Sequence, residues 1–581
     1  MNDASPKWSW LKAALILFAG AYIFGPAIGG GWLWDDNQEV TENAVLRDPD
    51  GLVKIWTGTA GADYFPLKTT VQWFAWRLWG DSPAGYHALS VLLHILSAFL
   101  FWRLLAKLGL RLAWIGGLLF VVHPVVVESV AWAAELKNTL SMPLLLLAMI
   151  AYVNYDGLAS LPPPAAPPPK TGKARGKTPT PSKEPRSPNW YGLSLVFFLL
   201  AMLSKSSVVM FPFVILLYCW WKRGRIAADD LRASVPFFAI SFGLGVVTFW
   251  FQHHRAMQPE VVLAGGPLSR LAGAGLALAF YLGKCVLPVG LLPIYPRWEI
   301  DPPSMAQFAP WLVFAAAVAW LWTKRAGWGR DVLFALGFFA LNLLPILGFV
   351  TITYMRITWV ADHFAYLSLL GVIGLAVAGL GRIRPTSQIP VATALVVAAA
   401  LAWESRAYAE NFQDEIAFWT YTIGGNPGAW SAHYNLATYL AHHGQLERAV
   451  GEFEETLRLR PAFLDARLNF GNTLANLGRL PEAAAQFEDA LRIDPNYLGA
   501  HVNLGIIYFM ANRVPEAIAQ YEEVLRVNPG LADIHGNLGD AFFTEHRVSE
   551  AISEYEEALR LKPGDARIQT NLNIARQALG Q

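Results

Sequence analysis

The sequence predicts an all-α fold in two parts, a polytopic membrane helix bundle of about eleven spans followed by a solenoid of short helix pairs. The 581 residues are 54% hydrophobic and include 24 Trp, which lies outside the range of soluble proteins. Apolar segments long enough to cross a bilayer recur up to about residue 404. From about residue 430 the chain is amphipathic and charged instead.

The membrane part begins with an apolar run over about residues 9–29, which we interpret as an uncleaved first span. The segment 268–287 either crosses the membrane or lies re-entrant in its interface. The positive-inside rule favours the second alternative, because it keeps Lys324 and Arg382 on the cytoplasmic side and gives eleven spans. The other candidate spans are 86–106, 112–132, 138–155, 190–203, 206–221, 231–252, 307–323, 331–350, 359–380 and 388–404.

A period of 34 residues marks the C-terminal part. This period is typical of tetratricopeptide repeats and predicts four helix-turn-helix units with a closing helix. We therefore divide the chain into a membrane domain (1–405), a connector (406–429) and a repeat domain (430–581). The period is carried by Pro427, Pro461, Pro495, Pro529 and Pro563, by Asn435, Asn469, Asn503, Asn537 and Asn571, and by Phe453, Phe487, Tyr521 and Tyr555.

Charge sets the orientation of the chain. Residues 156–188 form a Pro-rich stretch with six Lys or Arg against one Glu, which predicts a disordered cytoplasmic loop. With Lys7 inside, the first span delivers Asp35 and Asp36 to the outer side, and eleven spans place the repeats there too. The net charge of +1 gives no sign of a nucleic-acid partner. Cys219 and Cys285 show neither disulfide nor metal-ligand spacing, which argues against redox chemistry.

Polar groups at membrane depth are costly, so those in or beside spans are candidates for function. His123, Glu128, Glu135 and Lys137 approach the outer surface in one connection, and Arg356, Asp362 and His363 approach it in another. Several separated segments therefore converge on the face that carries the acidic pair. The remaining candidates are His87, His94 and Lys205.

The strings "WDDNQEVTENAVLRDPDGLVKIWTG", "HPVVVESVAWAAELKNTLS", "LAMLSKSS" and "VADHFAYLSLLG", followed by the repeats, resemble the transmembrane and tetratricopeptide repeat-containing (TMTC) proteins. The membrane half of that family is similar to the protein O-mannosyltransferases of the GT-C class. The resemblance implies a polyprenyl-phosphate sugar donor, an acceptor hydroxyl on the outer side, and an acidic pair in the first outer loop as catalytic base. The chain departs from the family pattern at His363, where Arg is usual, and at Ser206.

In the resemblance Asp35 takes the place of the base, and Asp36 would orient donor or acceptor. Transfer from a lipid phosphate needs one base, whereas a glycoside hydrolase needs two separated carboxylates. Lys137, Lys205 and Arg356 are candidates for the donor phosphate, and His123, Glu128 and His363 for orienting donor or acceptor. The competing interpretations are a solvated helix end for the two Asp, snorkelling for the Lys residues, and packing for His87 and His94.

No cofactor is expected with certainty. Asp35, Asp36 and Glu128 offer oxygen ligands for a divalent metal, although no spacing argues for one. In the repeats, Asn435, Asn469, Asn503 and Asn537 predict an amide ladder that pairs with a peptide backbone, against the alternative that Asn is structural there.

The sequence leads to the hypothesis of an inverting glycosyltransferase of the bacterial inner membrane, in contact with membrane lipid. Its active site and repeats face the periplasm, and its acceptor is a Ser or Thr hydroxyl of a protein. The alternatives are a non-catalytic membrane scaffold and a lipid-sugar flippase or transporter.

Overall fold

The protein is described by a computed structural model that covers residues 6–58, 61, 63–157, 187–256, 265–383 and 387–580. The chain separates into two compact units, Met1–Asn426 and Pro427–Gln581. The described residues form helices and no strand, so the predicted all-α class is confirmed. The predicted loop 156–188 lies almost entirely outside the described residues.

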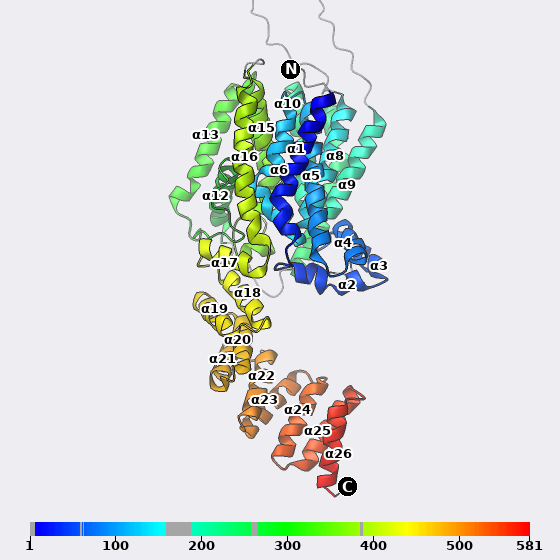
Figure 1. The fold of residues 1–581 in the computed structure, drawn as a ribbon, viewed down its shortest axis with the longest axis vertical. Helices are drawn as coiled ribbons and strands as arrows, with labels where there is room; N and C mark the ends of the chain where they lie inside the picture. The colour runs from blue at the N-terminus through cyan, green and yellow to red at the C-terminus, as the bar shows by residue number, and fades with distance from the viewer. Residues whose placement is uncertain are drawn as a thin grey trace, which may run out of the picture. The chain divides into compact units, whose positions relative to one another are not determined.

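Long apolar helices build the first unit, and they pack side by side with α1 against α5, α6 and α16 (Figure 1). Pro occupies the first turn of several of them, where its missing N–H leaves no hydrogen bond unmade. Their bounds are α1 Pro6–Ile28, α5 Pro83–Lys107, α6 Ala113–Val122, α8 Leu136–Asp156, α9 Pro188–Ser204, α10 Phe211–Arg223, α11 Ala228–Phe251, α12 Pro267–Val286, α13 Ala309–Thr323, α14 Trp328–Leu343, α15 Leu369–Gly381 and α16 Ile389–Ala409.

Seven helices among the described residues are long and apolar enough to cross a membrane. The helix pair Ala113–Val122 and Pro124–Ala131 would make an eighth span, but it bends by 57°. The segment predicted as a span over 112–132 is thus broken at His123, which is extended because it precedes Pro124 and proline disfavours the helical conformation of that residue; its crossing of the membrane stays a prediction. The segment after the break forms η2 (Pro124–Val126), α7 (Val127–Ala131) and η3 (Ala133–Glu135).

Helix α12 is not one of these seven, and it carries Arg270 and Lys284. Helices α9 and α15 are apolar but shorter than a full span. The count of eleven spans, and the choice between a spanning and an interfacial α12, stay predictions.

The stretch after α1 is folded and lies at one end of the helix bundle (Figure 1). It contains η1 (Asn37–Thr41), α2 (Ala44–Arg47), α3 (Gly51–Trp56) and α4 (Pro66–Trp79). A small apolar cluster joins these elements to the bundle, because Val40, Leu46 and Ala75 pack with Tyr86 of α5 and Ala133 of η3. The acidic pair therefore stands in a defined conformation.

The chain after α16 continues as η11 (Glu410–Phe412) and α17 (Glu415–Gly425), and both elements belong to the first unit. Phe412, Phe418 and Trp419 are fully buried there. The residues predicted as a connector thus pack into the membrane unit as far as Asn426.

The second unit confirms the predicted repeats, with four helix pairs and a closing helix. The recurring aromatic residue of each second helix meets a small residue of the first: a Cβ on Gly505 would lie 2.6 Å from the ring of Tyr521. Gly471 with Phe487 and Gly539 with Tyr555 repeat this contact. The helices are α18 Trp430–His442, α19 Leu446–Leu459, α20 Leu464–Asn476, α21 Leu480–Ile493, α22 Leu498–Met510, α23 Val514–Val527, α24 Ala532–Thr544, α25 Val548–Leu561 and α26 Ala566–Ala578.

Candidate active site

The acidic loop leaves α1 through three glycines. The Gly31 N–H donates to the Gln413 carbonyl at 2.8 Å. A Cβ on Gly30 would lie 3.0 Å from the same carbonyl oxygen, so this position favours glycine for close approach and not for a positive φ. The left-handed residue of the loop is Trp34, with a φ of 46°.

Aromatic packing surrounds Trp34. Its ring stacks on Trp132 with centroids 5.1 Å apart and meets Trp419 edge to face at 5.1 Å. The backbone N–H of Trp34 donates to Glu415 Oε1 at 2.8 Å. The residue directly before Asp35 is thus fixed by side chain and backbone.

The two acidic neighbours have different surroundings. Asp36 is fully buried, and its carboxylate accepts hydrogen bonds from the N–H groups of Leu33 at 2.9 Å and Ala134 at 2.6 Å. Oδ1 of Asp36 therefore joins the loop to η3, and Oδ2 closes a turn within the loop. These hydrogen bonds hold the loop, and the orienting role predicted for Asp36 stays a prediction.

Asp35 is half-buried, and no described residue donates a hydrogen bond to its carboxylate. Burial raises the pKa of Asp35 to about 6, an effect that nearby Lys137 opposes and that Glu39 and Glu135 reinforce. A carboxylate with free acceptor positions and a raised pKa can accept a proton from a hydroxyl group.

Two of the predicted cations converge on one carboxylate. Lys137 Nζ lies 3.0 Å from Glu135 Oε1, and Lys205 Nζ lies 3.4 Å from Glu135 Oε2. Lys205 also donates to Asn138 Oδ1 at 2.5 Å. The Lys137 side chain is 23% exposed and that of Lys205 is 10% exposed, so Lys137 is the more accessible to an anion.

One cation near the site is absent from the sequence-based candidates. Lys68 of α4 is buried and forms an ion pair with Glu39 of η1. The intramembrane rule could not select it, because α4 is too short and polar to be a span. The sequence feature that could have pointed to Lys68 is its i, i+4 spacing from Gln72, which puts both residues on one face of a helix. The structure buries both side chains.

The predicted orienting residues have hydrogen-bond partners within the protein. His363 contacts Glu128 through Nδ1 at 2.8 Å and donates its backbone N–H at 2.9 Å, and both side chains are buried. His123 accepts the Val125 N–H at Nδ1, and its Nε2 lies 3.1 Å from the Cys285 carbonyl oxygen. These contacts indicate positioning of the protein chain.

The other buried candidates also have protein partners. His94 Nδ1 lies 2.8 Å from the Tyr366 hydroxyl, and His87 Nε2 lies 3.3 Å from the Gly31 carbonyl oxygen. Asp362 accepts a hydrogen bond from the Tyr295 hydroxyl at 2.8 Å.

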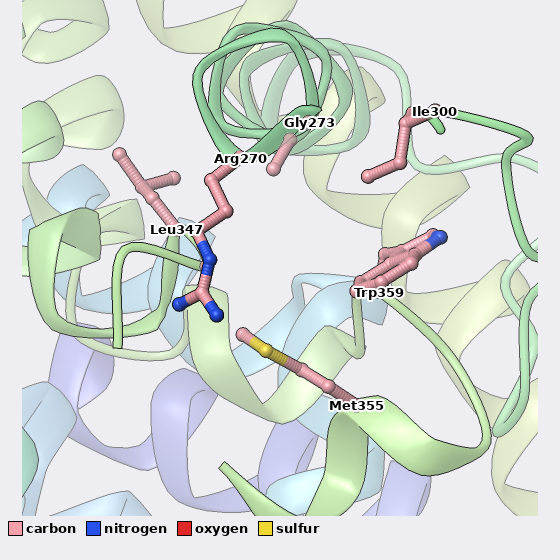
Figure 2. Close-up of a pocket in the computed structure, with 8 residues that line it drawn as sticks. Arg270, Gly273, Ile300, Leu347, Met355 and Trp359 are labelled. Atoms are coloured by element: carbon pink, nitrogen blue, oxygen red, sulfur yellow. The ribbon is translucent and has the colours of Figure 1, made fainter. Parts of the chain in front are cut away.

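Arg356 lies in η9 (Thr353–Arg356), which borders the site. Two residues earlier, the Tyr354 ring lies 6.2 Å from Trp34 and 5.2 Å from His363 between centroids. The next residue, Met355, lines a narrow pocket into which Arg270 of α12 also points, with Trp359 and Ile300 opposite (Figure 2).

Among the described residues, no group of three His, Cys, Asp or Glu side chains is arranged to hold a metal ion. In the predicted set Asp35, Asp36 and Glu128, two members already accept hydrogen bonds from other groups: Asp36 from backbone amides and Glu128 from His363. The sequence left a metal at these residues open, and the described residues present no three-ligand group for one.

The predicted asparagine ladder is partly bonded within the repeat unit. Asn469 donates to the Tyr434 hydroxyl at 3.0 Å, and Asn503 donates to Asn472 Oδ1 at 2.8 Å. Asn571 of the closing helix donates to Asp540 at 2.7 Å. Asn435 and Asn537 are half-buried and donate to none of the described side chains.

A family-model comparison agrees with the repeats of the second unit. A tetratricopeptide repeat family model matches residues 417–462, 434–497, 468–530 and 502–566. A crystal structure of MamA is 21% identical with a TM-score of 0.25, covering 26% of this chain and 82% of that one. A structure of YrrB, a TPR protein with an unusual peptide-binding site, is 20% identical with a TM-score of 0.26, covering 32% and 91%.

The match to one curated relative extends well beyond the repeats. Human protein O-mannosyl-transferase TMTC1 is 23% identical over an alignment of 507 residues, which covers 77% of this chain and 55% of the relative. The Caenorhabditis elegans protein O-mannosyl-transferase F38B6.6 is 25% identical over 26% of this chain and 25% of the relative, and Drosophila melanogaster Tmtc3 is 27% identical over 27% and 20%. The chain spans at most about half the length of these relatives. In sequence, the chain is related to the TMTC family, whose curated members matched here are named protein O-mannosyl-transferases.

Proposed function

We propose that the protein is a membrane glycosyltransferase that moves a sugar from a polyprenyl-phosphate donor to a hydroxyl group of a protein. The names of its relatives suggest mannose as the sugar. The observation that carries the proposal is the difference between the acidic neighbours. Both carboxylate oxygens of Asp36 accept backbone hydrogen bonds, whereas no described residue donates to the carboxylate of Asp35, on which Lys137 acts electrostatically.

The reaction follows from this arrangement. Asp35 accepts the proton of the acceptor hydroxyl, and the hydroxyl oxygen forms a bond to the anomeric carbon of the sugar. The bond from that carbon to the phosphate oxygen breaks on the opposite face, and the polyprenyl phosphate leaves with the electron pair. One base is sufficient because the phosphate leaves as an anion. The configuration at the anomeric carbon is inverted.

The raised pKa of Asp35 suits this role. A carboxylate with a pKa of about 6 is mostly deprotonated at neutral pH and is a stronger base than an ordinary Asp. A hydrolase with two acting carboxylates needs both side chains free at about 5 to 10 Å from each other. Asp36 is not free, which disfavours that alternative.

The departing phosphate would be stabilised by a fixed cation. Lys137 is the best candidate because it is the most exposed Lys at the site and acts electrostatically on Asp35. Lys205 forms a second ion pair with Glu135, and Arg356 borders the site in η9. Glu128, His363 and His123 hold the surrounding segments in place.

The repeats would supply the protein acceptor, since arrays of this kind are chiefly binding surfaces. The basic loops favour an orientation with the acidic pair and the repeats outside the cytoplasm, on the periplasmic side of a bacterial inner membrane. A protein scaffold without catalysis is the second candidate, and the match of the repeat model to residues 417–566 favours it.

Purified protein incubated with labelled polyprenyl-phosphate mannose and acceptor peptides tests the proposal. We expect transfer by the wild-type protein and a loss of roughly 10² to 10⁴-fold in Asp35→Asn, because the variant keeps the shape and removes the base. Asp50→Asn is the matched control, since Asp50 is an exposed acid of the same loop. Equal transfer by wild type and Asp35→Asn would refute the assignment.

A further inference from the structure

The loop that carries Asp35 is held by a segment that follows the last membrane helix. Glu415 begins α17, and its Oε1 accepts the Trp34 N–H at 2.8 Å across 381 positions of sequence. Its Oε2 accepts the indole N–H of Trp419, one turn further along α17. Glu415 is buried, so water does not compete freely for these two hydrogen bonds.

A second contact comes from Gln413, two residues before α17. The Gln413 carbonyl accepts the Gly31 N–H at 2.8 Å. Gly30 approaches the same carbonyl so closely that a Cβ would lie 3.0 Å from its oxygen. The segment 413–415 therefore holds the loop by hydrogen bonds at Gly31 and at Trp34.

The backbone conformation of Trp34 depends on these contacts. Its φ of 46° is uncommon for a bulky residue, and such a conformation persists only where the surroundings determine it. Stacking on Trp132 holds the ring, and the hydrogen bond to Glu415 holds the backbone. Relaxation of Trp34 would turn the peptide that leads into Asp35.

We propose that Glu415 is a positioning residue, which fixes Trp34 and thereby the place of the Asp35 carboxylate. The inference rests on the proposed function, in which Asp35 is the base. Its new content is that the active site is completed by the segment after the last membrane helix. Glu415 serves two donors, one on each oxygen, and a neutral amide of the same shape can serve only one of them.

The first test compares Glu415→Ala with Glu410→Ala. Glu410 is an exposed acid of the same segment and forms an ion pair with Arg406. We expect Glu415→Ala to lower kcat by roughly 10²-fold with little change in the donor KM, because a small misplacement of a base has this effect. Glu410→Ala should keep the wild-type kcat. Wild-type kcat in Glu415→Ala would overturn the proposal.

The second test is a rescue. In Glu415→Gln, the amide oxygen can accept the Trp34 N–H, but the amide NH₂ then faces the indole N–H of Trp419. Trp419→Phe removes that donor. The double variant Glu415→Gln/Trp419→Phe should therefore have a higher kcat than Glu415→Gln alone, a coupling that general destabilisation does not produce. A double variant no better than the single one contradicts the two-donor role.

A third measurement does not depend on transfer. Glu42 is exposed just after η1, and the native Cys219 and Cys285 are buried, so a spin label on Glu42→Cys reports the motion of the loop. We expect Glu415→Ala to free the label and Glu410→Ala to leave it unchanged. If no donor supports transfer but the label still responds in this way, the proposed reaction fails and the positioning stands. An unchanged label in Glu415→Ala refutes the positioning.

Discussion

The carboxylate of Glu128 accepts two hydrogen bonds from one residue, His363, through the backbone N–H at 2.9 Å and through Nδ1 at 2.8 Å. The residues are separated by 235 positions, and both are buried. The contact ties α7, after the break in the α6 segment, to η10 (Asp362–Ala365).

We therefore expect Glu128→Ala to lower the stability of the protein by about 3 to 5 kcal/mol, since removal of one member of a buried pair leaves the other without its partner. Thermal unfolding in detergent measures this. Glu299→Ala, a change outside the site, serves as the control. A melting temperature equal to that of the wild type would show that the pair does not support the fold.

The activity of the wild-type protein should fall as the pH decreases through about 6. The reason is that Asp35 must be deprotonated to act, and burial raises its pKa to about 6. A profile of kcat against pH measures the effect. An acid limb near pH 4 would mean that the group that titrates is an ordinary carboxylate.

The same group affects stability with a definite sign. Between about pH 4 and 6, folded Asp35 binds a proton that the unfolded chain has lost, so its contribution to stability decreases as the pH rises through this window. Asp35→Asn should therefore unfold at a higher temperature than wild type at pH 7, and this difference should vanish below about pH 4. Equal melting temperatures at pH 7 would contradict the raised pKa.

Replacement of Lys137 should change both the donor affinity and the pH profile. Lys137 lowers the pKa of Asp35, so Lys137→Met should move the acid limb to higher pH. Loss of a charged contact to phosphate should raise the donor KM by roughly tenfold or more. Lys54→Met, at an exposed ion pair of α3, is the control. An unmoved acid limb would place Lys137 away from the base.

The triple variant Asn469→Ala, Asn503→Ala and Asn537→Ala should weaken acceptor binding and leave donor binding intact. We expect a roughly tenfold rise in the acceptor KM if the amides pair with a peptide backbone. Asn496→Ala is a suitable control because Asn496 is an exposed residue of the turn before α22 and lies outside the ladder. An unchanged acceptor KM would make the ladder a purely structural feature.

The topology can be tested with reporters fused after Gln581. An orientation with the repeats outside the cytoplasm predicts activity of a periplasmic reporter and none of a cytoplasmic one. The opposite result would place the repeats and the acidic pair on different sides, or reverse both.

The parts of the fold that depend on local contacts were predictable. The 34-residue period fixes the repeat helices because the aromatic and glycine positions that meet lie within one repeat. The charged candidates of the membrane half were also found from the sequence, since Asp35, Glu135 and Lys137 do act on one another.

The parts that depend on distant contacts were not predictable. Asp36 bonds to Ala134 and Trp34 to Glu415, and nothing near either residue reveals these partners. The left-handed conformation of Trp34 is imposed by packing against residues that are distant in sequence.

The contact between a glycine and an aromatic ring has a consequence for the evolution of the repeat array. Gly505 meets Tyr521, and Gly539 meets Tyr555, each pair inside a single unit of 34 residues. Duplication or deletion of a whole unit of this kind leaves each of these rings with its own glycine. Gene rearrangement can thus lengthen or shorten the array, and change the reach of its binding surface, without repacking the units that remain.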